Sequence, residues 1–217
     1  MARLLFTARD FGSLTESNHQ STLHKFVTTN SIWFMRQNHG NNFQIITNKD
    51  GSPGVNRTDQ EVDALITAEP GISLAVMVAD CLPVLIDGSS VVAAVHVGRR
   101  GLMNEITLKV LQQMQQLNAQ INSISVGPHI CGNCYPLDEA TAKSVWQRYP
   151  SSNINAGKPA NNSSNCTDLY AGLQEQVHSF SNKLQLQRFG GCTFEKLQYF
   201  SHRASGDLGR QAGVISL

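Results

Sequence analysis

Apolar runs in the middle of the chain predict buried β-strands. Residues 73–79 and 83–87 are apolar and rich in β-forming side chains, and a further apolar run covers residues 91–97. Short runs of this kind, bounded by turn residues, are typical of strands that are covered on both faces. The turn residues 87–90 separate the last two runs, so we expect a hairpin at that point.

Other stretches show the period of a helix. Apolar residues recur on one face from residue 106 to residue 117, with glutamines mostly off that face, and this spacing predicts an amphipathic helix. Residues 137–149 and 169–184 are predicted to be helices on the same grounds. Apolar residues at 124–130 and 197–201 predict two further strands.

Two segments rich in small and polar residues, 48–60 and 151–165, are predicted to be surface loops. No segment has the composition of a linker between domains. Strands and helices alternate along the rest of the chain, which favours an α/β or α+β sheet core. We therefore expect a single domain over residues 1–217.

Charge is scarce in this chain. Charged residues make up 15% of the sequence, against about 25% in typical soluble domains. The formal net charge is +1, and Arg99–Arg100 is the only Lys/Arg doublet. So weak a positive field does not favour nucleic acid or an anionic membrane as a partner. A charge-poor small molecule, or a phosphate held by local donors, fits the composition better.

We expect a cytoplasmic protein. The first residues include Arg3, Arg9 and Asp10 and lack the apolar core of a signal peptide. The longest apolar stretch, residues 72–86, is too short to span a bilayer and is interrupted by Asp80. In a reducing compartment the five cysteines, an odd number, are expected to be thiols or metal ligands.

Three side chains that can bind a metal stand in unusual surroundings. His39 lies in a polar segment, Cys81 follows a predicted strand, and His96 interrupts an apolar strand. Two histidines and one cysteine suit a tetrahedral zinc with one open position for water or substrate. The common zinc-peptidase and zinc-deaminase motifs are absent from the sequence. Ordinary packing, as a turn histidine, a buried thiol and a core histidine, is the simpler interpretation.

Five short motifs follow one another along the chain. They are Gln-Asn-His-Gly at 37–40, Ala-Asp-Cys-Leu-Pro at 79–83, His-Val-Gly-Arg-Arg-Gly at 96–101, Gly-Pro-His-Ile-Cys-Gly-Asn-Cys-Tyr at 127–135, and Phe-Ser-His-Arg with a later Gly-Arg within 200–210. In this order they resemble the motifs of the YfiH/laccase-domain family, also called the multicopper polyphenol oxidoreductase-like family. The resemblance covers about residues 30–217, most of the chain.

The resemblance implies a fold, a cofactor and an activity. The implied fold is a mixed-sheet α/β/β/α layered sandwich. The implied metal is Zn²⁺, with Cu²⁺ as the alternative, and its ligands are His39, Cys81 and His96. The implied reactions are phosphorolysis of adenosine, inosine, guanosine and methylthioadenosine, and deamination of adenosine. Purine nucleoside and phosphate are then the partners, and a homodimer is the assembly to consider.

The resemblance also suggests roles for further residues. The expected catalytic residues are Cys81, His96 and Asp80, of which Asp80 would orient a ligand histidine or accept a proton near the substrate. Arg100, with the free amides of a strand-to-helix turn at 98–101, would hold phosphate. The expected substrate-binding residues are Asp63, Arg100, Tyr135, His202, Arg203 and Arg210.

Cys131 and Cys134 form a CxxC motif, which by itself suggests a redox pair or half of a zinc knuckle. No second CxxC is present, and the resemblance places this one beside the pocket. Two positions depart from the family pattern. Arg99 replaces a usual tryptophan, and Asn38 replaces a common apolar residue.

Two other enzyme functions are compatible with these residues. A copper site could oxidise polyphenols, although the sequence lacks the His-rich motifs of an enzyme with several coppers. Alternatively, Cys81 could be the nucleophile of a cysteine hydrolase that edits peptidoglycan precursors, with His96 as its base. A binding module without turnover is the remaining interpretation.

Overall fold

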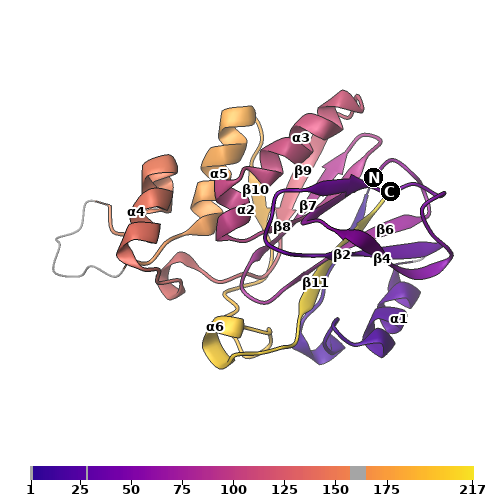
Figure 1. Ribbon diagram of the computed structural model, residues 1–217, viewed down its shortest axis with the longest axis horizontal. Coiled ribbons are helices and arrows are strands. Elements are labelled where there is room, and N and C mark those ends of the chain that lie inside the picture. Colours follow the sequence, from indigo (N-terminus) through magenta and orange to yellow (C-terminus); the bar gives the residue numbers. More distant parts are fainter. Residues whose placement is uncertain (1, 28, 157–164) are drawn as a thin grey trace.

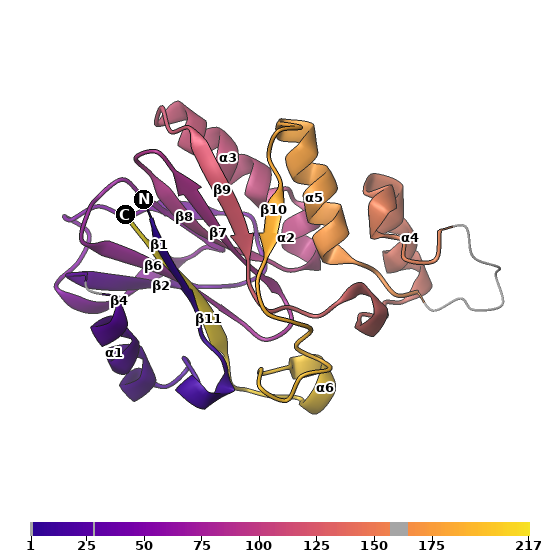
Figure 2. The ribbon, with the colours of Figure 1, turned by 180° about the vertical axis from the view of Figure 1, so that it is seen from behind.

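Two β-sheets stack face to face, and helices cover the outer face of each sheet (Figures 1 and 2). The computed structural model describes residues 2–27, 29–156 and 165–217. The layers run from a helix through a five-stranded and a six-stranded sheet to a second layer of helices. The predicted mixed-sheet α/β/β/α sandwich is therefore confirmed.

The smaller sheet brings the two ends of the chain together. Across the sheet its strands are β1 (Arg3–Phe6), β11 (Gln211–Ser216), β6 (Ile72–Val78), β2 (Ser31–Arg36) and β4 (Gly54–Glu61). β2 runs parallel to β4 and β6, whereas β11 runs antiparallel to β1 and β6. Because the first and last strands pair, the two ends lie side by side (Figure 1).

The larger sheet contains the predicted hairpin. Across the sheet its strands are β10 (Leu186–Arg188), β9 (Ile121–Val126), β7 (Leu82–Gly88), β8 (Val92–Val97), β5 (Ala64–Thr67) and β3 (Phe43–Ile45). β7 and β8 pair antiparallel, and Gly88 N donates to Val91 O at 2.9 Å. The hairpin prediction is thus confirmed. β9 and β10 are parallel neighbours, so both end at the same edge of the sheet.

Helices form where the apolar period predicted them. The α-helices are α1 (Ser17–Phe26), α2 (Arg99–Met103), α3 (Ile106–Gln116), α4 (Glu139–Arg148), α5 (Leu169–Phe180) and α6 (His202–Ser205), and the 3₁₀ turns are η1 (Arg9–Phe11), η2 (Gly132–Cys134) and η3 (Pro150–Ser152). α2, α3 and α5 pack on the six-stranded sheet, and α1 covers the five-stranded sheet. The Asp168 carboxylate caps α5 by accepting from Tyr170 N and Ala171 N.

The sheet interface is apolar. Trp33 and Leu74 of the smaller sheet share a buried cluster with Leu85 and Ala94 of the larger one. Alternate residues of the same strands, such as Val84, face the helices instead. β7 and β8 are therefore buried on both faces, which explains their nearly continuous apolar sequence.

One strand prediction is wrong. Residues 197–201 form a turn followed by irregular backbone, and Leu197 is 90% exposed. No sheet edge satisfies this backbone; instead the Arg9 guanidinium donates to Leu197 O (3.0 Å) and Tyr199 O (2.8 Å). The segment that does enter the sheet is the following one, β11.

One loop prediction is wrong in part. Residues Gly54–Glu61, inside or next to the predicted loop 48–60, form the edge strand β4 against β2. An edge strand with one solvated face carries many polar residues, which resemble a loop in the sequence. The other predicted loop, 151–165, lies partly outside the described residues.

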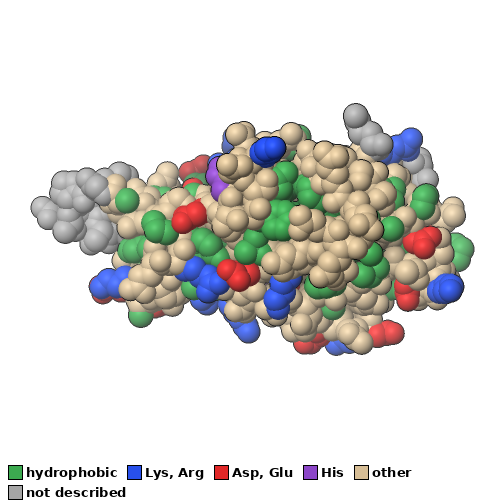
Figure 3. All heavy atoms as spheres, turned by 90° about the horizontal axis from the view of Figure 1, so that it is seen from above, with side chains coloured by type: hydrophobic (Ala, Val, Ile, Leu, Met, Phe, Trp, Pro, Cys, Tyr) green, Lys and Arg blue, Asp and Glu red, His purple; other side chains and the backbone are tan. Residues whose placement is uncertain are grey.

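The surface matches the scarcity of charge in the sequence. In Figure 3, charged side chains are scattered among uncharged atoms and form no continuous field of one sign. In the part of the chain that the structure describes, no helix is both long enough and apolar enough to cross a membrane. The five cysteines, all of them described, are free.

Candidate active site

The three predicted metal ligands meet at one edge of the sandwich. His39 follows β2, Cys81 lies between β6 and β7, and His96 is near the end of β8. Their ligand atoms all lie within 4.8 Å of one another. Cys81 Sγ is 3.8 Å from His39 Nε2, and the two imidazole centroids are 4.7 Å apart. Strand ends from both sheets are needed to bring these side chains together.

This donor set fits a metal ion. Imidazole nitrogen and thiolate sulfur are ligands that zinc and copper share. In a tetrahedral zinc site, neighbouring donor atoms lie roughly 3.3–3.8 Å apart. The observed separations, up to 4.8 Å, are near this range, and small side-chain rotations close the difference. Three protein ligands leave one tetrahedral position free.

Asp63 holds the turn that carries His39. Its carboxylate accepts from the backbone N–H groups of Asn38 (3.2 Å), His39 (3.0 Å) and Gly40 (2.7 Å). His39 has φ = 62°, in the left-handed region, which costs a non-glycine residue about 1–2 kcal/mol. The three hydrogen bonds offset that cost and keep the His39 imidazole beside Cys81.

The same carboxylate orients the second histidine. His96 Nδ1 lies 2.6 Å from Asp63 Oδ1, and both side chains are buried. A histidine whose Nδ1 donates to a carboxylate presents Nε2 to a metal. Asp63 was predicted to contact substrate, but it is fully buried and both of its oxygens bind protein groups. It is therefore a positioning residue.

Electrostatics favour a thiolate at Cys81 and a charged imidazole at His96. Burial would raise the pKa of Cys81, but the charge of His96 and the hydrogen bond with His39 outweigh it and lower that pKa to about 6. Burial would lower the pKa of His96, but Cys81 and Asp63 outweigh it and raise that pKa to about 9. Near neutral pH the metal-free site thus holds a thiolate beside an imidazolium.

Zinc binding at about pH 7 is expected to release about one proton, because the metal must displace the proton from His96. Since the pKa of His96 is about 9, zinc affinity should rise about tenfold per pH unit between about pH 7 and pH 9. Below about pH 6, the pKa of Cys81, zinc affinity should change more steeply with pH, because the Cys81 thiol must then also lose a proton. Calorimetry in buffers of different ionisation enthalpy counts the protons. An affinity that is flat over the upper interval would contradict this protonation state.

Gly98 leaves room for the ligands. A methyl group at Gly98 would lie 3.0 Å from Cys81 Sγ and 3.1 Å from His39 Cδ2. Gly98→Ala is therefore expected to shift both ligands and to weaken zinc binding about tenfold, with the fold retained. Chelator competition measures the affinity, and circular dichroism the fold. Wild-type zinc affinity in a folded Gly98→Ala variant would contradict the steric explanation.

A cavity of about 700 Å³ opens beside the three ligands, which form part of its wall. This volume is within the range of small-molecule sites. Four of the predicted substrate-binding residues also line it: Tyr135, His202, Arg203 and Arg210. Arg100 does not line the cavity; it is exposed on the short helix α2. The structure therefore does not bring the phosphate contact predicted for Arg100 into this cavity.

Two further arginines, Arg36 and Arg57, line the same cavity. They extend from the neighbouring strands β2 and β4. Burial and the charge of Arg36 lower the pKa of Arg57, so the two guanidinium groups interact. Sequence reasoning missed both. Arg36 could have been found as the neighbour of the Gln-Asn-His-Gly motif, whereas Arg57 was hidden in a predicted loop.

Asp80 anchors the C-terminal wall of the cavity. Its Oδ1 accepts from the hydroxyl groups of Thr193 and Ser201, both at 2.7 Å, and its Oδ2 accepts from Arg203 N at 2.7 Å. It was predicted to orient a ligand histidine or to accept a proton. Its oxygens instead bind the segment that carries His202 and Arg203, so we assign it a positioning role.

Of the two departures from the family motifs, Asn38 has a local structural role. The Asn38 side chain accepts from Gly40 N (3.0 Å) and donates to Glu61 (2.9 Å), which stabilises the turn before the first ligand. The Gln37 amide pairs with both backbone groups of Met77 and so ties the end of β2 to β6. Arg99 is half-buried on α2 and does not line the cavity.

Comparisons with known proteins agree with the motifs. A family model described as multi-copper polyphenol oxidoreductase laccase matches residues 4–217. The chain is 34% identical over 195 residues to a purine nucleoside phosphorylase of Corynebacterium glutamicum, covering 88% of this chain and 76% of that protein. It is 38% identical over 82 residues to adenosine deaminase RL5 of an unknown prokaryotic organism, covering 36% of this chain and 31% of that protein.

A solved structure supports the fold. The hypothetical protein YfiH of Bacillus licheniformis superposes with a TM-score of 0.79 at 20% identity. The match covers 100% of this chain and 92% of that protein. The two molecules therefore share the layered sandwich described above.

Proposed function

The chain belongs to the multi-copper polyphenol oxidoreductase laccase family, and we propose that it is a metal-dependent purine nucleoside phosphorylase. One observation carries the proposal: a His/Cys/His donor set and four arginines line a single cavity. Such a cavity suits an uncharged nucleoside together with an anionic phosphate. The similarity to a purine nucleoside phosphorylase supports that substrate class. Adenosine, inosine, guanosine and methylthioadenosine are the substrates that we propose.

His39, Cys81 and His96 would hold the metal, which we propose to be Zn²⁺, with Cu²⁺ as the alternative. When bound, it would supply a Lewis acid and lower the pKa of water at the cavity wall. Asp63 keeps both imidazole rings in place for this role. The same metal site would serve the second activity that we propose, deamination of adenosine, which the short match to an adenosine deaminase supports.

In phosphorolysis a phosphate oxygen forms a bond to C1′ of the ribose while the bond from C1′ to the purine nitrogen breaks. Guanidinium groups bind phosphate through paired, charge-assisted hydrogen bonds, so the arginines of the cavity would hold and orient it. His202, on the cavity wall, would donate a proton to the departing purine. The Tyr135 ring, 5.2 Å from the Arg203 guanidinium carbon, would pack against the nucleoside.

Arg57→Gln is expected to raise the KM for phosphate about tenfold or more and to leave the KM for nucleoside nearly unchanged. A hydrogen bond to a charged group contributes about 1.5–3 kcal/mol, and each 1.4 kcal/mol is about a factor of ten. Initial rates at varied phosphate give the value. Arg100→Gln is the comparison, because Arg100 lies outside the cavity. A raised KM for phosphate in Arg100→Gln, with an unchanged KM for phosphate in Arg57→Gln, would instead place phosphate at the start of α2.

The proposed function is tested with purified, metal-quantified protein and adenosine, with and without phosphate. Phosphate-dependent release of adenine supports phosphorolysis, and phosphate-independent formation of inosine supports deamination. Chromatography separates the products. Absence of both products from protein with a filled His39/Cys81/His96 site would overturn the proposal.

A second candidate is a cysteine hydrolase that edits peptidoglycan precursors. The specific observation in its favour is that the pKa of Cys81 is lowered to about 6 beside His96, as a nucleophilic thiolate requires. This function predicts turnover in chelator-treated, metal-free protein. A copper-dependent polyphenol oxidase, which the family description suggests, predicts phenol oxidation only after copper loading.

A further inference from the structure

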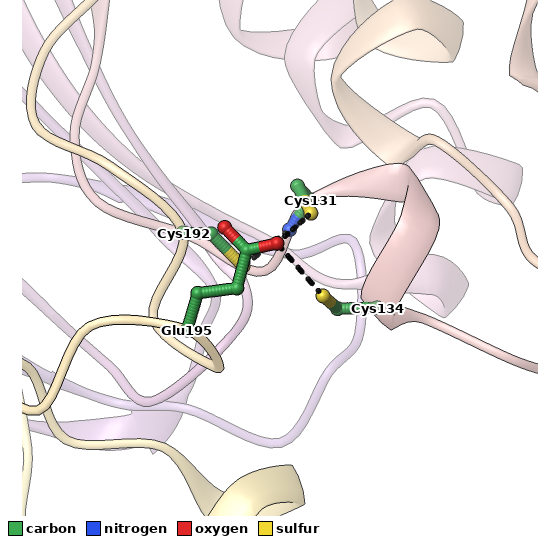
Figure 4. Close-up of side chains that lie close together, drawn as sticks. All are labelled: Cys131, Cys134, Cys192 and Glu195. Atoms are coloured by element: carbon green, nitrogen blue, oxygen red, sulfur yellow. Dashed lines mark hydrogen bonds between the residues drawn. The ribbon is translucent and has the colours of Figure 1, made fainter.

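A second cluster of metal-binding side chains lies away from the three ligands already described. It consists of Cys131, Cys134, Cys192 and Glu195 (Figure 4). One ligand atom from each of the four lies within 4.8 Å of the others. Figure 4 shows the Glu195 carboxylate directed at the thiols of the CxxC motif. The function proposed above uses none of these residues.

The fold explains why these residues meet. Cys131 and Cys134 follow β9, while Cys192 and Glu195 follow β10. Since β9 and β10 are parallel neighbours, both segments leave the same edge of the sheet. A bridge between His129 and Cys192 then continues the parallel pairing beyond the two strands. The fourth member, Glu195, comes one turn after Cys192.

Local geometry directs the side chains to a common point. The 3₁₀ turn η2 closes with a hydrogen bond from Cys134 N to Cys131 O (3.0 Å), which places the two CxxC thiols on one side. Cys131 N donates to Cys192 Sγ at 3.3 Å. Glu195 Oε1 lies 3.5 Å from Cys134 Sγ and 3.9 Å from Cys131 Sγ. In metal–thiolate sites, backbone N–H groups commonly stabilise sulfur in this way.

Alternative explanations leave part of the cluster unaccounted for. A disulfide between Cys131 and Cys134 would use two thiols and leave Cys192 and Glu195 without a role. Simple burial of thiols does not require a carboxylate among them. The same groups as three thiolates and one carboxylate would repel one another without a cation between them. A divalent cation removes this repulsion and uses all four groups.

We propose that Cys131, Cys134, Cys192 and Glu195 bind a second divalent cation of the zinc type. Three thiolates and one carboxylate complete a tetrahedral shell, and in zinc proteins a closed shell of four protein ligands is structural. Soft sulfur ligands select zinc over magnesium or calcium. The site has no open position, so its role is to tie two segments together.

One of those two segments reaches the wall of the cavity, and the other contacts a residue of that wall. Tyr135, which lines the cavity, follows the CxxC motif directly. Thr193, next to Cys192, donates to Asp80 beside the first metal site. A cation at the second site therefore couples the CxxC turn to the C-terminal wall. This assignment is independent of the proposed activity, because metal counting requires no turnover.

The test is the zinc content of the full chain, purified under reducing conditions and measured by elemental analysis and native mass spectrometry. We expect about two zinc ions per chain in the wild type, and about one in Cys134→Ser and in Cys81→Ser. Cys166→Ser is the matched control, because Cys166 is a free cysteine outside both donor sets and a serine hydroxyl can still donate to Asn133 O; it should keep two. Wild type and Cys134→Ser with equal zinc content would overturn the proposal.

A second variant keeps the proposal testable if Cys134→Ser does not fold. Glu195→Gln keeps the three thiols and should release one of the two zinc ions to a chelator about 10- to 100-fold faster than the wild type. After cobalt substitution, the thiolate-to-metal absorption should fall in Cys134→Ser much more than in Cys81→Ser, since three sulfurs bind at one site and one at the other. A protein with one metal and a Cys131–Cys134 disulfide by mass spectrometry would refute the second site.

Discussion

Cys81→Ser is expected to empty the His39/Cys81/His96 site and to lower phosphorolysis at least about a thousandfold. A thousandfold loss corresponds to about 4 kcal/mol of transition-state stabilisation, which is within the contribution of a metal acting as Lewis acid. Serine cannot replace the thiolate, because its hydroxyl group stays protonated near neutral pH and is a poor zinc ligand. The remaining ligands, two neutral histidines, would compete weakly with water.

Two measurements on this variant belong together: zinc per chain and the rate of adenine release. Loss of one zinc together with the activity supports a ligand role for Cys81. Loss of activity at unchanged metal content would instead identify Cys81 as a nucleophile and favour the cysteine hydrolase. Cys166→Ser, which removes a buried thiol outside the donor set, should leave both quantities unchanged.

Asp63→Asn is expected to cost about 3–5 kcal/mol of unfolding free energy and to weaken zinc binding about 10- to 100-fold. Asp63 accepts from three backbone N–H groups and from His96. An asparagine amide has one acceptor oxygen and would turn an NH₂ group toward these donors. The charge that stabilises the His96 imidazole would also be lost.

The effect of Asp63 depends on pH in a defined direction. Burial raises the pKa of Asp63, but the hydrogen bond to His96 and those from Gly40 and Asn38 outweigh it, so the pKa lies below its usual value. A carboxylate with a lowered folded-state pKa stabilises the fold above its unfolded pKa of about 4 and loses that contribution as the pH falls through the folded value. The difference between wild type and Asp63→Asn should therefore shrink in acid.

Urea unfolding at several pH values measures this difference, and chelator competition measures the zinc affinity. Asp59→Asn, at an exposed position of β4, is the matched control and should change neither. A stable Asp63→Asn variant with wild-type zinc affinity would show that the buried carboxylate does not hold the ligand histidines.

Part of this fold could be predicted because the burial of some segments is visible in their pattern of apolar residues. The strands β6, β7 and β8 were predicted correctly, since burial on both faces produces nearly continuous apolar runs. Helices α3 and α5 were predicted from one apolar stripe each. β4 was missed, because an edge strand shows little apolar pattern until its partner is known.

The first donor set was selected from the sequence, whereas the functions of its neighbours were not. His39, Cys81 and His96 were chosen by residue type and by family motif, and the structure places them together. Asp63 and Asp80 were expected at the substrate, but both carboxylates are occupied by hydrogen bonds within the protein. Each carboxylate is more than twenty residues away in the chain from these hydrogen-bond partners. No local sequence pattern therefore indicates the contacts.

The sequence by itself determined the chemistry of the ligands, the apolar runs that become buried strands, and the family. These properties follow from residue type and local spacing. Only the tertiary structure decided that Arg36 and Arg57 share the cavity, that Asp63 serves both histidines, and that Cys192 meets the CxxC motif. Each of these contacts requires two strands to pair in a particular order and register, and that pairing is set by the packing of the whole sandwich.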